Sequence, residues 1–191
     1  NAYKEIITNY KSPKIISFVA GIKSKKYLKI NKDIQFMRAM PNTSSKFNLG
    51  ITAIFNATFK EGNLKKVKKL FKNVGIVLEL DKENKIDVFT GMIGSGPAYF
   101  FYLLKSYQKK LMYLCHSDQK MVNDVMVNLI KGVGSSIEHN QDLDELIATV
   151  ASKRGTTEAG LNSFKSLKLN KSFEDGINAA IQRSKEISNE F

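Results

Sequence analysis

One segment of this sequence combines residue types that bind anions. Residues 152–157 read Ser-Lys-Arg-Gly-Thr-Thr, and a helical pattern follows them. The first amides of a helix have no partner within the helix, so with the helix dipole and neighbouring hydroxyls they can hold a carboxylate or a phosphate. Lys153 and Arg154 add positive charge. The simpler interpretation is a helix capped by Thr156 or Thr157, since threonine is a common capping residue.

Two further segments place small polar residues at the ends of predicted elements. Residues 38–43 read Arg-Ala-Met-Pro-Asn-Thr and end a predicted strand. Ligands bind at the carboxyl ends of strands in open α/β sheets, but Pro-Asn also favours an ordinary turn. Residues 94–99 read Gly-Ser-Gly-Pro-Ala-Tyr and could present free amides to an anion. Phe100 and Phe101 follow, and they favour a tight helix entry inside a core instead.

The elements that carry these segments fall into two compositional halves. Short apolar runs in the first half predict strands at 15–21, 34–40, 51–55 and 76–80, with a helix around 64–71. Strands interleaved with a helix indicate an α/β fold. The second half predicts only helices, starting at Pro97, Asp118, Asp142, Thr156 or Thr157, and Phe173. Helices this apolar need mutual packing or a second subunit.

The charge of the chain does not predict a nucleic-acid partner. The 191 residues carry 30 Lys and Arg against 18 Asp and Glu, a net charge of +12, but only Arg38, Arg154 and Arg183 are arginines. Phosphate recognition favours the bidentate arginine fork, so the lysines indicate a solvated surface, including the run at 65–69. The longest uncharged run, 88–104, is short for a membrane span and contains Gly-Pro, so no membrane partner is expected.

The cysteine and histidine content excludes other kinds of site. Cys115 is the only cysteine, so an intrachain disulfide and a cysteine-based zinc site are excluded, and the chain fits a reducing, cytoplasmic location. His116 and His139 do not form a metal-binding pattern, and no metal is predicted. We interpret all three residues as structural.

Five segments in register resemble the pyrroline-5-carboxylate reductase family. Ile-Ser-Phe-Val-Ala-Gly at 16–21 is similar to the family's strand ending in Ala-Gly, and residues 38–43 resemble its Arg-x-Met-Pro-Asn-Thr signature. Residues 94–99 match the core of its Ser-Gly-Ser-Gly-Pro-Ala-Tyr segment. Residues 155–161 resemble the end of Ser-Pro-Gly-Gly-Thr-Thr-x-Ala-Gly-Leu, and residues 179–186 fit its last helix. The likeness covers nearly the whole chain.

The resemblance implies an α/β plus all-α protein. The C-terminal part of a Rossmann-type, NAD(P)-binding domain would span residues 1–82, and an all-helical dimerisation and substrate-binding domain would span 83–191. The implied reaction reduces 1-pyrroline-5-carboxylate to L-proline with NADPH or NADH, as the final step of proline biosynthesis. The implied assembly is a homodimer or a higher homo-oligomer, and the active site would form where the two kinds of domain meet.

The resemblance also implies the roles of individual residues. The nicotinamide side would be lined by Ala20, Gly21, Pro41 and Asn42. The substrate carboxylate and the neighbourhood of the ring nitrogen would be held by Ser152, Gly155, Thr156 and Thr157. Thr157 would be the catalytic hydroxyl nearest the imine nitrogen, where it orients the substrate, while the cofactor supplies the hydride.

The sequence departs from the family pattern at three places. The first Ser of the Ser-Gly-Ser-Gly segment is Ile93, and the Pro-Gly before Gly155 is Lys153-Arg154. No G-x-G-x-x-G turn occurs, so we expect the chain to lack roughly 70 residues that carry the dinucleotide fingerprint. Two alternatives therefore stay open: a related reductase of another imine or of a hydroxy acid, and an inactive remnant that retains only dimerisation.

Overall fold

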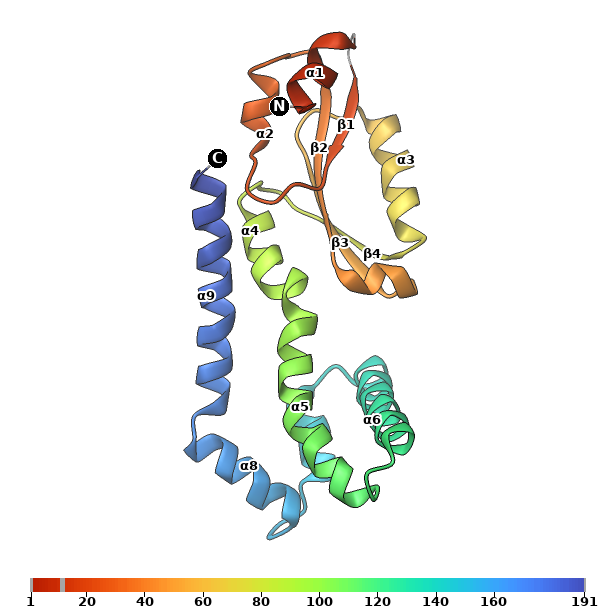
Figure 1. The fold of residues 1–191 in the computed structure, drawn as a ribbon, viewed down its shortest axis with the longest axis vertical. Helices are drawn as coiled ribbons and strands as arrows, with labels where there is room; N and C mark the ends of the chain where they lie inside the picture. The colour runs from red at the N-terminus through yellow and green to blue at the C-terminus, as the bar shows by residue number, and fades with distance from the viewer. Residues whose placement is uncertain (1, 11–12, 191) are drawn as a thin grey trace. The chain divides into compact units, whose positions relative to one another are not determined.

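The chain folds into two compact units. The structure, a computed structural model, describes residues 2–10 and 13–190. The first unit comprises the chain up to Pro97 together with the segment from Asp175 onward, and the second comprises Ala98–Glu174 (Figure 1). The first unit contains strands and helices, whereas the second is helical throughout its described elements.

The first unit is built on a mixed four-stranded sheet in the order β1-β2-β3-β4. The strands are β1 (Lys14–Ser17), β2 (Gln35–Pro41), β3 (Gly50–Asn56) and β4 (Gly75–Glu79). β1 is parallel to β2 and β3 is parallel to β4, but β2 and β3 are antiparallel. The carboxyl ends of β1 and β2 therefore share one edge, and those of β3 and β4 share the opposite edge.

All four predicted strands are present, but the first is shorter than predicted. The sequence predicts a buried strand that continues to Gly21, whereas β1 ends at Ser17. Phe18 and Val19 are 51% and 48% exposed. Their apolar character indicated a buried strand, but they belong to the turn that follows β1.

Helices cover both faces of the sheet. They are α1 (Ala2–Asn9), α2 (Ser24–Leu28), α3 (Glu61–Lys72) and α4 (Lys85–Phe89), with the 3₁₀ turn η1 (Thr43–Phe47) between β2 and β3. The neighbouring strand residues Phe36 and Met37 point to opposite faces. Phe36 packs with residues of α1 and α2, and Met37 packs with residues of α3 (Figure 1).

The lysines of α3 lie where the sequence predicts. Lys65, Lys66 and Lys69 are exposed, whereas Leu64 and Phe71 of the same helix are buried in the core. The run 65–69 is therefore the solvated face of an amphipathic helix.

The last helix, α9 (Leu169–Glu190), is attached to the first unit by its C-terminal half. Asp87 of α4 is buried and accepts hydrogen bonds from the hydroxyls of Ser184 at 3.2 Å and Ser188 at 2.6 Å. A Cβ on Gly91 would lie 2.6 Å from the backbone nitrogen of Ile181, so α9 approaches this position closely. Two hydroxyl donors thus satisfy the buried carboxylate of Asp87.

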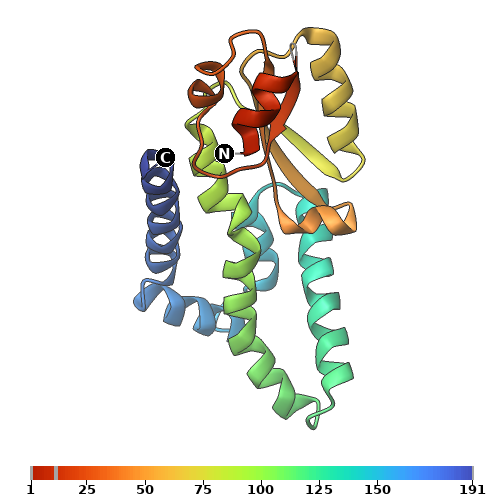
Figure 2. The same ribbon diagram turned by 45° about the horizontal axis from the view of Figure 1, so that its top comes forward.

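The second unit contains the body of α5 (Gly96–Leu114), α6 (Gln119–His139), α7 (Leu143–Val150) and α8 (Thr156–Ser166). The chain reverses between α5 and α6 at a tight turn (Figure 2), where His116 and Ser117 both have positive φ. The two predicted caps are confirmed. Asp118 accepts from the amide of Met121, and Asp142 accepts from the amides of Asp144 and Glu145, all at 3.0 Å.

The segment at 94–99 differs from both interpretations of its sequence. α4 leads into the π-helical turn η2 (Thr90–Gly94), and only Ser95 separates η2 from α5. The amide and the hydroxyl of Ser95 both donate to the carbonyl of Thr90, at 3.0 and 3.2 Å. Because the helices follow one another almost without a break, this segment forms no separate anion-binding helix start. The prediction that Phe100 and Phe101 are core is also wrong, since they are 60% and 65% exposed.

The described ranges contain neither a membrane-spanning helix nor a metal-binding cluster. No helix there is long and apolar enough to cross a membrane. No group of three or more His, Cys, Asp and Glu side chains there could hold a metal ion.

We predict that Gly75→Ala destabilises the protein by about 3 kcal/mol. Gly75 has a φ of +139°, and an added Cβ would overlap the backbone of Gly50 in the paired strand. Gly62→Ala is the matched control, because nothing lies within 4 Å of that Cβ and alanine favours a helix. Urea denaturation of both variants checks this, and equal stabilities would contradict it.

Candidate functional site

The four residues predicted on the nicotinamide side lie at one edge of the sheet. Ala20 and Gly21 belong to the turn after β1, and Pro41 ends β2 with Asn42 next to it. β1 and β2 are parallel, with Ser17 paired to Arg38, so both segments leave the same edge. We call these four residues the cofactor half-site.

Gly21 has a structural reason to be glycine. Its φ is +80°, and a Cβ there would lie 2.8 Å from Cγ2 of Ile187 in α9. The side of Gly21 that lacks a side chain is therefore filled by the protein itself. Ala20 is exposed beside it. Among the residues that the structure describes, the amide N–H groups of Ala20 and Gly21 have no partner.

Asn42 uses only part of its side chain to hold the fold. Its Oδ1 accepts from the amide of Ile51 at 3.0 Å, and its own amide donates to the carbonyl of Ile51 at 3.1 Å. Within residues 2–10 and 13–190 its Nδ2 has no partner, which leaves two donors. This edge of the sheet therefore presents free backbone amides and a free carboxamide N–H group beside an exposed turn.

The other four predicted residues lie in the second unit, between α7 and α8. α7 ends at Val150, and α8 begins at Thr156 with Gly155 as its N-cap residue. The prediction that a threonine caps this helix is wrong, because Gly155 has no side chain to accept a bond and both threonines already lie inside the helix. Glu158 reaches back instead, and its Oε2 accepts from the amide of Arg154 at 2.6 Å.

The start of α8 presents unused hydrogen-bond donors. The amide of Gly155 donates to the carbonyl of Ser152 at 2.9 Å, and the amide of Ala159 donates to the carbonyl of Gly155 at 3.1 Å. Between them, the amides of Thr156, Thr157 and Glu158 have no partner in the part of the chain that is described. We call Ser152, Gly155, Thr156 and Thr157 the carboxylate cradle, because three free amides at a helix N-terminus suit an anion.

The departure from the family pattern at Arg154 falls on a strained backbone position. Arg154 has a φ of +60°, in the left-handed region that glycine adopts freely and other residues adopt at a cost. A Cβ on Gly155 would overlap Oγ of Ser152 and lie 2.9 Å from its carbonyl oxygen, so that glycine is required by packing. The loop therefore keeps a glycine-type conformation at a position that holds arginine.

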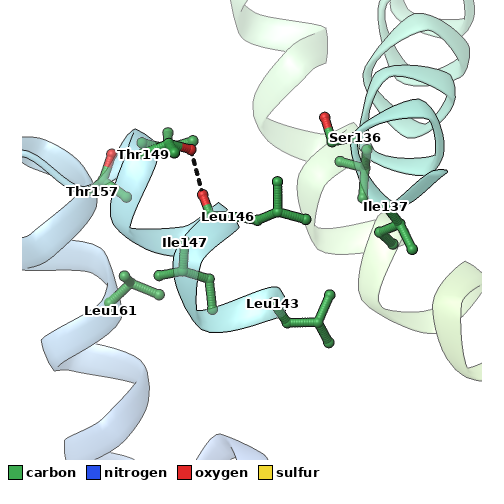
Figure 3. A pocket seen from close by; sticks show the side chains of 10 residues that line it. Ser136, Ile137, Leu143, Leu146, Ile147, Thr149, Thr157 and Leu161 are labelled. Atoms are coloured by element: carbon green, nitrogen blue, oxygen red, sulfur yellow. Dashed lines mark hydrogen bonds between the residues drawn. The ribbon is translucent and has the colours of Figure 1, made fainter. Parts of the chain in front are cut away.

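A largely apolar hollow of about 380 Å³ lies beside the cradle, between α6, α7 and α8 (Figure 3). Thr157 and Leu161 of α8 border it, together with side chains such as Val133, Ile137 and Ile147. The hydroxyl proton of Thr149 is not available to a ligand, because the hydroxyl donates to the carbonyl of Leu146 at 2.7 Å. Such a lining suits apolar side chains better than a polar substrate.

Sequence reasoning missed one residue that shapes the cofactor half-site. Glu83 accepts hydrogen bonds from Ser24 and from Arg38, and Arg38 in turn donates to the carbonyl of Val19. A single glutamate between a strand and a helix carries no sequence pattern that would single it out.

Fold and site define a class of protein: a Rossmann-type α/β part followed by a helical dimerisation domain. The sequence model described as pyrroline-5-carboxylate reductase dimerisation matches residues 83–187. A pyrroline-5-carboxylate reductase of Staphylococcus epidermidis is 32% identical over 192 residues, which cover 98% of this chain and 69% of that protein. The chain belongs to the pyrroline-5-carboxylate reductase family.

Solved structures agree with this assignment. A pyrroline-5-carboxylate reductase from Coxiella burnetii superposes with a TM-score of 0.84 at 27% identity, over 98% of this chain and 70% of that one. A Plasmodium falciparum pyrroline carboxylate reductase with NADP bound has the same fold, with a TM-score of 0.88 at 22% identity over 97% and 75% of the two chains. The roles of individual residues in the cofactor half-site and the carboxylate cradle stay predictions. The division of the chain between residues 82 and 83 also stays a prediction.

We predict that Arg154→Gly stabilises the protein by about 1 kcal/mol, because glycine adopts the left-handed backbone of this loop without the steric cost. Lys153→Gly is the control, since Lys153 lies next to it without a positive φ and gains nothing. Thermal denaturation compares the two variants. A melting temperature of Arg154→Gly at or below that of the wild type would contradict the prediction.

Proposed function

We propose that this protein reduces 1-pyrroline-5-carboxylate to L-proline with NADPH or NADH, as the final step of proline biosynthesis. The observation that carries the proposal is the carboxylate cradle, with three unpaired amides at the start of α8 in a chain of this family. The substrate is a small cyclic imine whose only charged group at neutral pH, apart from the ring nitrogen, is a carboxylate. A helix N-terminus with adjacent hydroxyls matches that group.

In this proposal the cradle binds and orients the substrate. The amides of Thr156 and Thr157 hold the carboxylate, and Ser152 and Gly155 shape the loop that keeps these amides free. Thr157 is the second residue of α8. Its hydroxyl forms a hydrogen bond with the ring nitrogen, which gains a proton as the C=N bond is reduced. Orientation by fixed groups of this kind supplies much of the rate of such reactions.

The cofactor half-site holds the nicotinamide end of the cofactor. Ala20 and Gly21 offer free amides, and Asn42 offers Nδ2 next to Pro41. The bound cofactor supplies the hydride. A Plasmodium falciparum protein of the same fold has been solved with NADP bound, which supports a nicotinamide dinucleotide as the cofactor here. Hydride transfer requires contact between the nicotinamide and the imine carbon. In this proposal the cofactor half-site and the carboxylate cradle therefore bind the two reactants of one reaction.

We also propose that the protein works as a homodimer or higher homo-oligomer in the cytoplasm, with residues 1–82 serving the cofactor and residues 83–191 serving dimerisation and substrate. The dimerisation family model supports the homo-oligomer, and so do the apolar side chains that α6 and α7 leave exposed, among them Val133, Ile137 and Leu143. A second copy of the chain would cover them.

The direct test is an assay of the full-length gene product. NADPH or NADH oxidation is followed at 340 nm with 1-pyrroline-5-carboxylate, and with a panel of other cyclic imines and 2-keto acids. We expect turnover with the pyrroline carboxylate above all other compounds. Turnover with another imine or keto acid alone would show that the protein is a related reductase. No turnover with any of these compounds would reject the proposal that the protein is an enzyme.

We predict that Thr157→Ala lowers kcat/KM for 1-pyrroline-5-carboxylate about tenfold or more, a loss of roughly 1.4 kcal/mol of transition-state stabilisation. Ser166→Ala is the matched control, because it removes a hydroxyl from the far end of the same helix, where Oγ bonds only its own helix at the Ser163 carbonyl. Steady-state kinetics of both variants checks this. Equal values for both would assign the site to backbone amides alone.

We predict that Ile137→Lys converts the dimer to a monomer, because a charge in the middle of an apolar contact is not paired there. Glu138→Lys is the control, since the next side chain along α6 points about 100° away around the helix. Light scattering behind size-exclusion chromatography gives the mass of each variant. A dimeric Ile137→Lys protein would show that this face of α6 lies outside the interface.

A further inference from the structure

The turn between β1 and α2 is the part of the cofactor half-site that lacks regular secondary structure. β1 ends at Ser17 and α2 begins at Ser24, so residues 18–23 lie outside both elements. A segment of this kind keeps one conformation only if side chains from elsewhere hold it. The residues that hold it therefore set the geometry of Ala20 and Gly21.

Glu83 holds the far end of this turn from the loop between β4 and α4. Its Oε1 accepts from the backbone amide of Ser24 at 2.6 Å, and its Oε2 accepts from the hydroxyl of Ser24 at 2.8 Å. The same Oε1 accepts from Nη1 of Arg38 at 3.3 Å. One carboxylate thus joins the first residue of α2 to β2, the strand that ends at Pro41 and is followed by Asn42.

Arg38 holds the near end of the turn. Its Nη2 donates to the carbonyl of Val19 at 3.3 Å, one residue before Ala20. The side chain of Arg38 is 3% exposed and that of Glu83 is 20% exposed, so the charge of Arg38 has little access to water. Loss of Glu83 would leave a buried guanidinium without its carboxylate, which favours movement of Arg38 away from Val19.

The turn is closed on a third side by α9. Ile187 fills the space beside Gly21, and Nζ of Lys23 donates to Oδ1 of Asn189 at 3.2 Å. Ala20 is exposed within this turn, as Phe18 and Val19 are, whereas Gly21 is buried. The Arg38–Glu83 pair is the part of this support that links the turn directly to β2, and so links the two segments of the cofactor half-site to each other.

We infer that Glu83 and Arg38 are positioning residues for the nicotinamide, acting through the turn at 18–23 without touching the cofactor. The inference rests on the proposed function, because it takes this turn to line the nicotinamide. Misplacement of reacting groups by about 1 Å can cost about a hundredfold in rate. Loosening the turn should therefore weaken cofactor binding and slow hydride transfer, while leaving the binding of the pyrroline carboxylate unchanged.

The test compares Glu83→Gln with the full-length wild type. Glutamine keeps an acceptor for the Ser24 amide but loses the charge that pairs with Arg38. Ser24→Ala is a milder second variant that removes only the hydroxyl bond. Glu61→Gln is the matched control, because Glu61 pairs with Lys65 at 3.3 Å on the exposed face of α3, away from the turn. Each protein is measured by hydrogen exchange of peptides covering 18–28, by NADPH fluorescence titration, and by steady-state kinetics.

For Glu83→Gln we expect faster exchange in 18–28, an NADPH Kd raised about tenfold, a lower kcat and an unchanged KM for 1-pyrroline-5-carboxylate. Ser24→Ala should shift in the same direction by less, and Glu61→Gln should match the wild type. Unchanged exchange in both turn variants, or faster exchange with unchanged Kd and kcat, overturns the inference.

The outcome separates this inference from the proposed function. If the wild type binds NADPH but does not reduce 1-pyrroline-5-carboxylate, the proposed function fails, and a raised NADPH Kd with faster exchange in Glu83→Gln still supports the positioning role. If the wild type does not bind NADPH or NADH, both fail. A kcat that falls with no change in Kd or in local exchange indicates lost folded protein and overturns the positioning role.

Discussion

Arg38 carries a positive charge into the interior of the sheet-bearing unit, and much of the local structure follows from the need to satisfy it. A buried guanidinium requires a carboxylate and several oxygen acceptors, because removal of its partner typically costs 3–5 kcal/mol. Glu83 supplies the carboxylate, and the carbonyl of Val19 supplies a further acceptor. The turn after β1 is therefore tied to the neighbouring strand through this buried charge and the groups that satisfy it.

The carboxylate cradle and the cofactor half-site keep their hydrogen-bond donors free for different physical reasons. The carboxylate cradle is left open because Gly155 has no capping side chain and because Glu158 bonds outward to Arg154, which leaves three amides unused. The cofactor half-site is held by Arg38, Glu83 and Ile187 of α9, and this support leaves Ala20 exposed. In both cases the donors are exposed by what the neighbouring residues do, and not by the residues of the motif alone.

Local features of the sequence predicted the structure where local interactions decide it. Asp118 and Asp142 cap their helices as predicted, because a cap is made within three residues of the capping side chain. The same rule failed at Thr156, where a glycine immediately before the threonines takes the cap position. Phe100 and Phe101 were expected in a core, but apolar character does not specify which partner covers a side chain. Arg38 and Glu83 are 45 residues apart in the sequence, and no local sequence pattern predicts their contact.

The route of the chain through the two units has a consequence for synthesis on the ribosome. The first unit is interrupted at Pro97 and completed only from Asp175 onward. Chains emerge N-terminus first, so the sheet and its helices leave the ribosome long before Ser184 and Ser188 do. Until those serines arrive, the carboxylate of Asp87 lacks the two hydroxyls that donate to it in the folded unit. The segment that carries Ser184 and Ser188 thus joins a unit whose sheet has already left the ribosome.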